Sequence, residues 1–155
     1  MAFLSGDSIL PQSILKRFDH VGIAVWNTDD ALLVYRDILG GELLRYKLKG
    51  TGGVYDFTQL ELGRQKLEFI EPVAEMGESF LTKFLRTKGE GMHHLTFQVN
   101  NLADATSYLR DKGLRIVDES FQDPIWMTGF VSPRSARGVL IQIYETSRGS
   151  EYDQP

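Results

Sequence analysis

Cysteine is absent from the 155-residue chain, which excludes disulfides, thiolate nucleophiles and cysteine-ligated metal centres. Basic residues are outnumbered, with 17 lysines and arginines against 21 aspartates and glutamates, and the net charge of −4 argues against a nucleic-acid partner. No apolar run approaches the ~18 residues of a membrane span, and the first residues do not combine a charged start with a long apolar run. We therefore expect a cytoplasmic protein with neither a nucleic-acid nor a membrane partner.

What the chain does contain is a repeat of itself. Shifted by 74 residues (94 minus 20), the segment 20–37 aligns without a gap with the segment 94–111, and seven of the 18 pairs are identical. Average residue usage gives about one identity by chance. The same shift places Glu68 on Gln142, so the similarity extends well beyond the aligned segment.

The repeat predicts two related modules, 17–72 and 91–146, each with the element order βαβββ. The first reads as a strand from His20, a helix capped by Thr28 and ended by Gly40, and strands near 42–48, 54–62 and 66–71. The second reads as a strand from His94, a helix capped by Asn101 and ended by Gly113, and strands near 115–119, 128–132 and 139–145. A helix over 79–87 bridges them, and 1–16 and 147–155 are terminal extensions of a single domain, 17–146.

The spacing of apolar residues predicts which helix faces are buried. In the first module the predicted stripe is Leu32, Tyr35, Ile38 and Leu39; in the bridging helix it is Phe80, Leu81, Phe84 and Leu85. Together with the strands, these helices indicate the α+β class. We expect the two tandem βαβββ modules to form one curved mixed sheet that bears a cleft.

Four polar residues occupy equivalent places in the two modules. Within each module the histidine and the second polar residue are 48 positions apart (68 minus 20, and 142 minus 94). All four fall on predicted strands, on the face opposite the apolar neighbours. Two imidazoles, a carboxylate and an amide oxygen suit one divalent metal with coordination positions left open. The sequence predicts a metal site made by His20, Glu68, His94 and Gln142, and it does not choose among cobalt, nickel, manganese, zinc and iron.

Three segments of the chain resemble a known family. They are 19–25 (DHVGIAV), 89–97 (GEGMHHLTF), and 132–135 (SPRS) with 138–142 (GVLIQ). They are similar to the methylmalonyl-CoA epimerases of the vicinal oxygen chelate superfamily, which also includes glyoxalases, bleomycin resistance proteins and dioxygenases. The resemblance implies a paired-module fold around one metal ion and a homodimeric assembly.

The resemblance also implies roles for individual residues. In the epimerases the metal ligands are histidine, glutamine, histidine and glutamate in chain order, whereas here Glu68 and Gln142 have exchanged the amide and the carboxylate. A glutamate base of that family matches Asp56, which follows Gly53-Val54-Tyr55. Gln142 cannot accept a proton, so Glu68 becomes the candidate base, with Asp56 or water as its partner. Arg134 is a candidate contact for a substrate carboxylate or phosphate.

The expected function is that of a metal-dependent isomerase or epimerase that passes through an enolate. Its substrate would be an acyl-CoA or a similar small carbonyl acid. Three alternatives stay open: a glyoxalase-type lyase, an iron(II) oxygenase that uses the two histidines and Glu68, and a non-catalytic small-molecule binding protein of the same fold.

Overall fold

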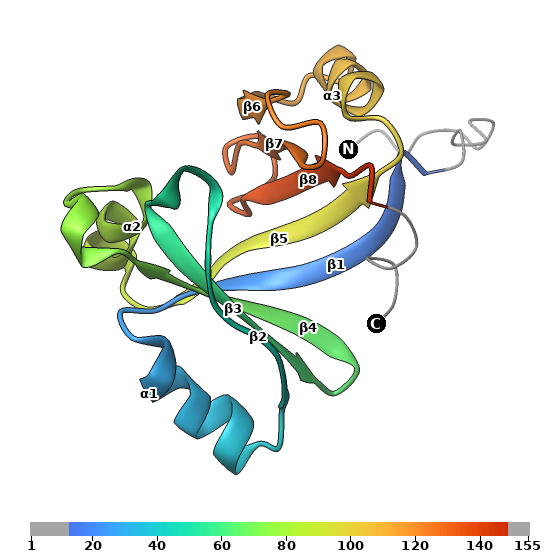
Figure 1. Cartoon of the computed structure of the whole chain (residues 1–155). Coiled ribbons are helices and arrows are strands. Elements are labelled where there is room, and N and C mark those ends of the chain that lie inside the picture. The colour runs from blue at the N-terminus through green and yellow to red at the C-terminus, as the bar shows by residue number, and fades with distance from the viewer. Residues whose placement is uncertain (1–12, 149–155) are drawn as a thin grey trace. The chain divides into compact units, whose positions relative to one another are not determined.

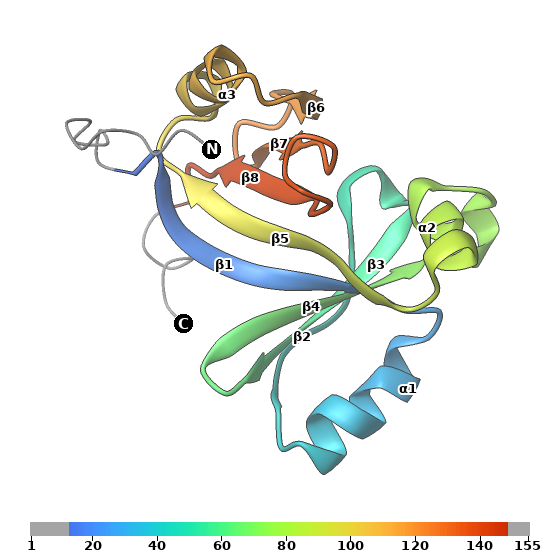
Figure 2. The ribbon, with the colours of Figure 1, turned by 180° about the vertical axis from the view of Figure 1, so that it is seen from behind.

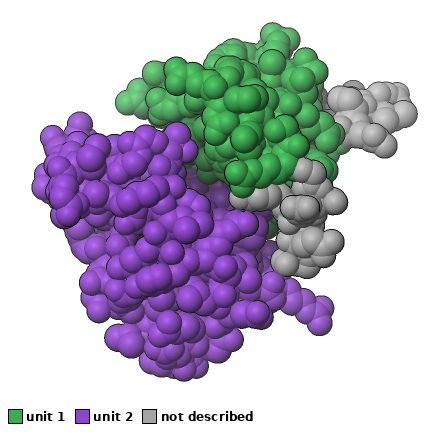
Figure 3. Space-filling model, viewed as in Figure 1, with its two compact units in different colours: residues 1–18, 97–149 green, residues 19–96, 150–155 purple. Residues whose placement is uncertain are grey.

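The computed structural model describes residues 13–148, and these form two compact units (Figure 3). Residues 19–96 form one unit, and residues 13–18 with 97–148 form the other. Two strands, β1 (Leu15–Ala24) and β5 (Gly91–Val99), contribute residues to both. The domain boundaries 17–146 stay a prediction.

The unit of residues 19–96 holds the elements expected of the first module. After β1 come the helix α1 (Thr28–Leu32), a π-helical turn η1 (Leu33–Ile38), and the strands β2 (Glu42–Lys49), β3 (Tyr55–Leu62) and β4 (Gln65–Pro72). Short 3₁₀ turns, η2 (Thr51–Gly53) and η3 (Ala74–Met76), precede β3 and the bridging helix α2 (Phe80–Lys88). The three predicted strands and the bridging helix are confirmed to within a few residues.

The second unit repeats the pattern. After β5 come the helix α3 (Leu102–Asp111) and the strands β6 (Ile116–Ser120), β7 (Met127–Val131) and β8 (Ile141–Glu145). Helix α3 lies beside β6, β7 and β8 in both ribbon views (Figures 1 and 2). The strands hydrogen-bond in the order β2-β3-β4-β1-β5-β8-β7-β6, which makes an open eight-stranded sheet. Strands β1 and β4 are parallel while β2–β3, β3–β4, β6–β7 and β7–β8 are antiparallel, so the mixed α+β class is confirmed.

The two modules begin their helices in the same way. The Asn27 side chain accepts from Asp29 N at 2.8 Å, and the Asn101 side chain accepts from Asp104 N at 2.8 Å. The expected cap at Asn101 is confirmed, whereas the expected cap at Thr28 is wrong. Thr28 is the first helical residue, and its own N–H donates to a carboxylate of β4. An asparagine one residue earlier satisfies the free N–H groups of the first turn, which is why it takes the cap position.

Two glutamates at equivalent strand positions continue the internal repeat into the tertiary structure. Glu71 Oε2 accepts the Thr28 N–H at 2.6 Å, and Glu145 Oε2 accepts the Leu102 N–H at 2.7 Å. Each carboxylate meets the N-terminal end of a helix, where the free N–H groups carry partial positive charge. The same contact in both units supports the duplication inferred from the offset of 74 residues.

The helices pack on opposite faces of β3 and β4 in the unit 19–96. Leu60 and Phe69 pack with Leu32 of α1, whereas Ile70, the next residue of β4, packs with Leu81 of α2. This follows from the alternation of side chains along a strand. Three of the residues expected in buried stripes are instead exposed: Ile38, Leu39 and Phe80. The α-helix gives way to a π-helical turn at Leu33, so α-helical spacing does not hold at 38 and 39. None of the helices in the described part of the chain has the length and apolar character to cross a bilayer.

Candidate metal centre

Three of the four predicted ligands come together within the unit 19–96. His20 lies on β1, Glu68 on β4 and His94 on β5. One ligand atom from each residue lies within 4.8 Å of the others. Because β1 and β4 are parallel and Gly22 is the partner of Glu68, residue 20 and residue 68 are diagonal neighbours on one face of the sheet.

Gly22 leaves the space that the His94 ring occupies. A Cβ atom built on Gly22 would lie 2.1 Å from Cε1, 2.3 Å from Nδ1 and 2.6 Å from Nε2 of His94. No side chain fits at such distances, so glycine at position 22 is a requirement of the site. Because Gly22 has no side chain, the imidazole of His94 can lie against β1, near the two other ligands.

A buried carboxylate orients the first histidine. Asp19 Oδ2 lies 2.6 Å from His20 Nδ1, and both side chains are almost fully buried. On the other side of the ring, His20 Nε2 lies 3.0 Å from Thr96 Oγ1 and 3.4 Å from Glu68 Oε1. A carboxylate on the remote nitrogen fixes the ring orientation and raises the basicity of the ligating nitrogen in metal-binding histidines. Asp19 therefore leaves Nε2 as the nitrogen directed to the centre.

The second oxygen of Glu68 is held by a neighbouring amide. Gln59 is the cross-strand partner of Glu68, and its Nε2 donates to Glu68 Oε2 at 2.7 Å. Arg45 Nη1 donates in turn to Gln59 Oε1 at 2.7 Å, which fixes which end of the amide faces the carboxylate. Oε1 of Glu68 is thus the oxygen that faces His20.

The charges of the three residues are coupled. Burial alone would lower the pKa of His20, but the Glu68 and Asp19 carboxylates outweigh it and raise that pKa to about 9. Burial opposes ionisation of Glu68, and the charge of His20 overcomes it and lowers the pKa of that carboxyl. Burial, together with the charge of His20, lowers the pKa of His94 to about 3. At neutral pH the site therefore holds one charged imidazole, one carboxylate and one neutral imidazole.

This donor set fits a divalent metal ion. Neutral imidazole and carboxylate are the ligands of zinc, iron, cobalt and nickel sites, and a cation entering here would take the place of the proton on His20. The three residues could therefore hold a metal ion through His20, Glu68 and His94. A set of three protein ligands is also the pattern of catalytic sites, where positions remain for water or substrate.

Two further predicted site residues belong to the other unit. Gln142 is on β8 in the second unit, where its Nε2 donates to Thr128 Oγ1 at 3.1 Å. Arg134 is exposed in the turn between β7 and β8. Their roles as fourth ligand and substrate contact stay predictions.

Asp56 is separated from Glu68 by the pleat of the sheet. On β3 and β4 the partner of Glu68 is Gln59, whereas the partner of Asp56 is Glu71. Because side chains alternate along a strand, Asp56 lies on the opposite face of β3 from Gln59. Its Oδ1 lies 2.8 Å from Lys49 Nζ. The structure does not bring Asp56 to Glu68, and we assign it no part in the proton transfer proposed below.

Four residues of the site were missed from the sequence: Asp19, Thr96, Gln59 and Arg45. Asp19 could have been noted, because it adjoins His20 in the sequence and metal-binding histidines commonly donate their second ring N–H to a carboxylate. Gln59 and Arg45 carry no such signal, because their contacts depend on the register of three strands.

The fold, the internal repeat and the donor set together define a class of protein. The family model of the Glyoxalase/Bleomycin resistance protein/Dioxygenase superfamily matches residues 19–129, and the chain belongs to this family. The chain is 31% identical over 142 residues to the uncharacterised Bacillus subtilis protein YqjC, covering 90% of this chain and 99% of that protein.

Two relatives carry an activity in their names. The mitochondrial methylmalonyl-CoA epimerase of Mus musculus is 31% identical over 134 residues, covering 83% of this chain and 72% of the mouse protein. The crystal structure of methylmalonyl-CoA epimerase from Mycobacterium tuberculosis superimposes with a TM-score of 0.75 at 28% identity, covering 91% of this chain and 95% of the other. The predicted similarity to these epimerases is confirmed.

Proposed function

We propose that this protein is a metal-dependent epimerase or isomerase that moves the proton next to the carbonyl of an acyl-CoA thioester. The observation that carries the proposal is the convergence of His20, Glu68 and His94 on one centre. The substrate class is supported by the similarity to methylmalonyl-CoA epimerases. We propose one divalent metal per chain, and a homodimer as the working assembly.

A bound divalent metal would supply a Lewis acid that lowers the cost of negative charge on a carbonyl oxygen. His20 and His94 would hold it from β1 and β5, and the contact with Asp19 would keep the His20 ring in the ligating orientation. In the metal-free protein the charge of His20 lowers the pKa of Glu68, and a bound cation in place of the His20 proton would favour the same ionised carboxylate. It is therefore in the state that a general base requires.

The proton transfer follows from this assignment. The bond between the α-carbon and its hydrogen breaks, the proton passes to Glu68, and the electron pair moves toward the thioester oxygen. Return of a proton from water to the opposite face of the α-carbon inverts the centre, and Glu68 gives its proton to solvent. Gln59 holds one oxygen of Glu68 throughout and so limits rotation of the carboxylate.

The test is exchange of the α-hydrogen with solvent deuterium, read by mass spectrometry on methylmalonyl-CoA. The wild-type protein should incorporate deuterium, and Glu68→Gln should retain metal but lose roughly 10²–10⁴-fold in exchange rate. His94→Ala should lose most of its metal. Glu75→Gln, the same chemical change at an exposed position outside the site, should exchange like the wild type.

A second pair of results identifies where the base lies. Adding Gln142→Glu to Glu68→Gln restores the ligand order of the epimerases and should recover part of the exchange. Unchanged exchange in Glu68→Gln would remove Glu68 as the base. Absence of exchange in the metal-loaded wild type, with methylmalonyl-CoA and other acyl-CoA thioesters, would contradict the proposed function.

One alternative is favoured by the same residues. Two histidines and one carboxylate are the ligand set of iron(II) oxygenases, and His20, His94 and Glu68 supply it. Iron in the purified protein together with substrate-dependent oxygen consumption would select this function. A metal that does not consume oxygen, together with deuterium exchange, selects the epimerase.

A further inference from the structure

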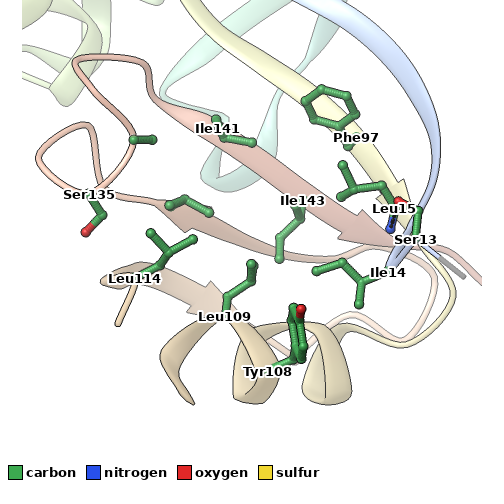
Figure 4. Close-up of a pocket in the computed structure, with 12 residues that line it drawn as sticks. Ser13, Ile14, Leu15, Phe97, Tyr108, Leu109, Leu114, Ser135, Ile141 and Ile143 are labelled. Atoms are coloured by element: carbon green, nitrogen blue, oxygen red, sulfur yellow. Dashed lines mark hydrogen bonds between the residues drawn. The ribbon is translucent and has the colours of Figure 1, made fainter. Parts of the chain in front are cut away.

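A pocket of about 550 Å³ lies under helix α3 in the unit formed by residues 13–18 and 97–148. Leu109 and Tyr108 of α3 and the following Leu114 line one side, and strand residues such as Ile141 and Ile143 line the other (Figure 4). The volume is in the range of small-molecule sites, roughly 300–1,000 Å³.

The pocket is on the opposite face of β8 from the predicted ligand Gln142. Ile141 and Ile143 pack against α3, and side chains alternate along the strand. The pocket is therefore not a part of the face that carries Gln142, and the epimerase proposal makes no use of it.

The first module shows how the equivalent place is filled there. At the equivalent position under α1, the rings of Tyr35 and Phe69 pack with their centroids 4.9 Å apart, and Leu32 is 2% exposed. Shifted by 74 residues, these positions become Leu109, Ile143 and Thr106. Every one of the three replacements is smaller. At the two positions of the first module's aromatic pair the second module therefore has no ring, and the rings that line its pocket, Phe97 and Tyr108, stand where the first module has Ile23 and Val34.

The lining also limits the charge of an occupant. No described residue that lines the pocket is charged, and its polar side chains are two serines and a tyrosine. One of these, Ser135, already accepts the Arg115 N–H at 2.9 Å. A charged group placed here would lose its hydration without gaining a partner, so the lining selects against ions.

We propose that this pocket binds a neutral, apolar small molecule with one or two aromatic ring systems, which takes the place of the aromatic pair of the first module. Burial of the rings removes apolar surface from water on both sides and restores the contacts that the smaller side chains do not make. The site is independent of the metal centre and of the proposed epimerase activity.

The probe for the test is N-phenyl-1-naphthylamine, a neutral dye with two aromatic ring systems, a naphthyl and a phenyl group, whose fluorescence rises in apolar sites. The full chain should bind it saturably. The double variant Ile143→Phe with Leu109→Tyr, which transplants the first module's aromatic pair, should weaken binding by at least about tenfold because the rings fill the space. Ile125→Phe is the matched control, since Ile125 is exposed, lies outside the pocket and should leave binding unchanged.

Methyl-resolved NMR of the wild type gives an independent measurement if the double variant does not fold. The dye should shift the methyl signals of Ile141, Ile143 and Leu109, and leave those of Leu32 and Leu60 in the first module's core in place. Shifts confined to other methyls, or undiminished binding in a folded double variant, would overturn the proposal.

Discussion

Replacing Gly22 with alanine places a methyl group in the space of the His94 imidazole. The new Cβ would lie 2.1 Å from His94 Cε1, whereas ordinary contact begins near 3.4 Å, so the ring must move by about 1.3 Å (3.4 minus 2.1). Metal–nitrogen distances in proteins hold to within ~0.2 Å, so a displacement of this size removes His94 from the coordination shell.

Two quantities should change together. Loss of one of three ligands should weaken metal binding by at least the roughly 100-fold seen when orienting partners are removed. Overpacking of the buried ring should lower the free energy of unfolding by about 1–3 kcal/mol. Calorimetric titration with Co²⁺ or Zn²⁺ measures the first effect, and urea denaturation of the metal-free protein measures the second.

The matched control is Gly129→Ala. There the nearest atom to the added methyl group is Glu119 Cγ at 3.2 Å, which is the flexible part of a side chain. This variant should keep wild-type metal affinity. If Gly22→Ala also binds metal like the wild type, the assignment of His94 as a ligand held against Gly22 is refuted.

Two further predictions concern protonation and assembly. Metal binding at pH 7 should release about one proton, because His20, with a pKa of about 9, is protonated in the metal-free chain and must become neutral to coordinate. Calorimetry in two buffers of different ionisation enthalpy measures the number of protons released. A binding enthalpy that is the same in both buffers would contradict the prediction. The affinity should therefore rise with pH between about 6 and 9. The homodimer should form through the exposed apolar side chains of η1 and the edge strand β2, among them Ile38 and Leu44. Sedimentation velocity should show Ile38→Glu with Leu44→Glu as a monomer and Val139→Glu as a dimer, since Val139 lies in the other unit and is about as exposed as Leu44 (40% against 39%). A monomeric wild type at high concentration would refute the assembly.

The offset of 74 residues between the modules predicts the order of helices and strands and three of the residues that converge at the candidate metal centre. A duplicated βαβββ unit repeats its strand positions, and period-two alternation assigns His20, Glu68 and His94 to the face opposite their apolar neighbours. These are local properties of the chain, so a single sequence contains them. The cap at Asn101 is of the same kind, because capping depends on the two or three residues that follow.

Side-chain contacts between neighbouring strands could not be predicted from the sequence and are known only from the tertiary structure. The pairing of Gln59 with Glu68 and the separation of Asp56 from it depend on the register of β3 against β4, and a shift of one residue would exchange the two faces. The need for glycine at position 22 arises from a ring that is 72 residues away in the chain (94 minus 22). The pocket under α3 depends on the volume that several separate elements leave unfilled, and no periodicity in the sequence records that volume.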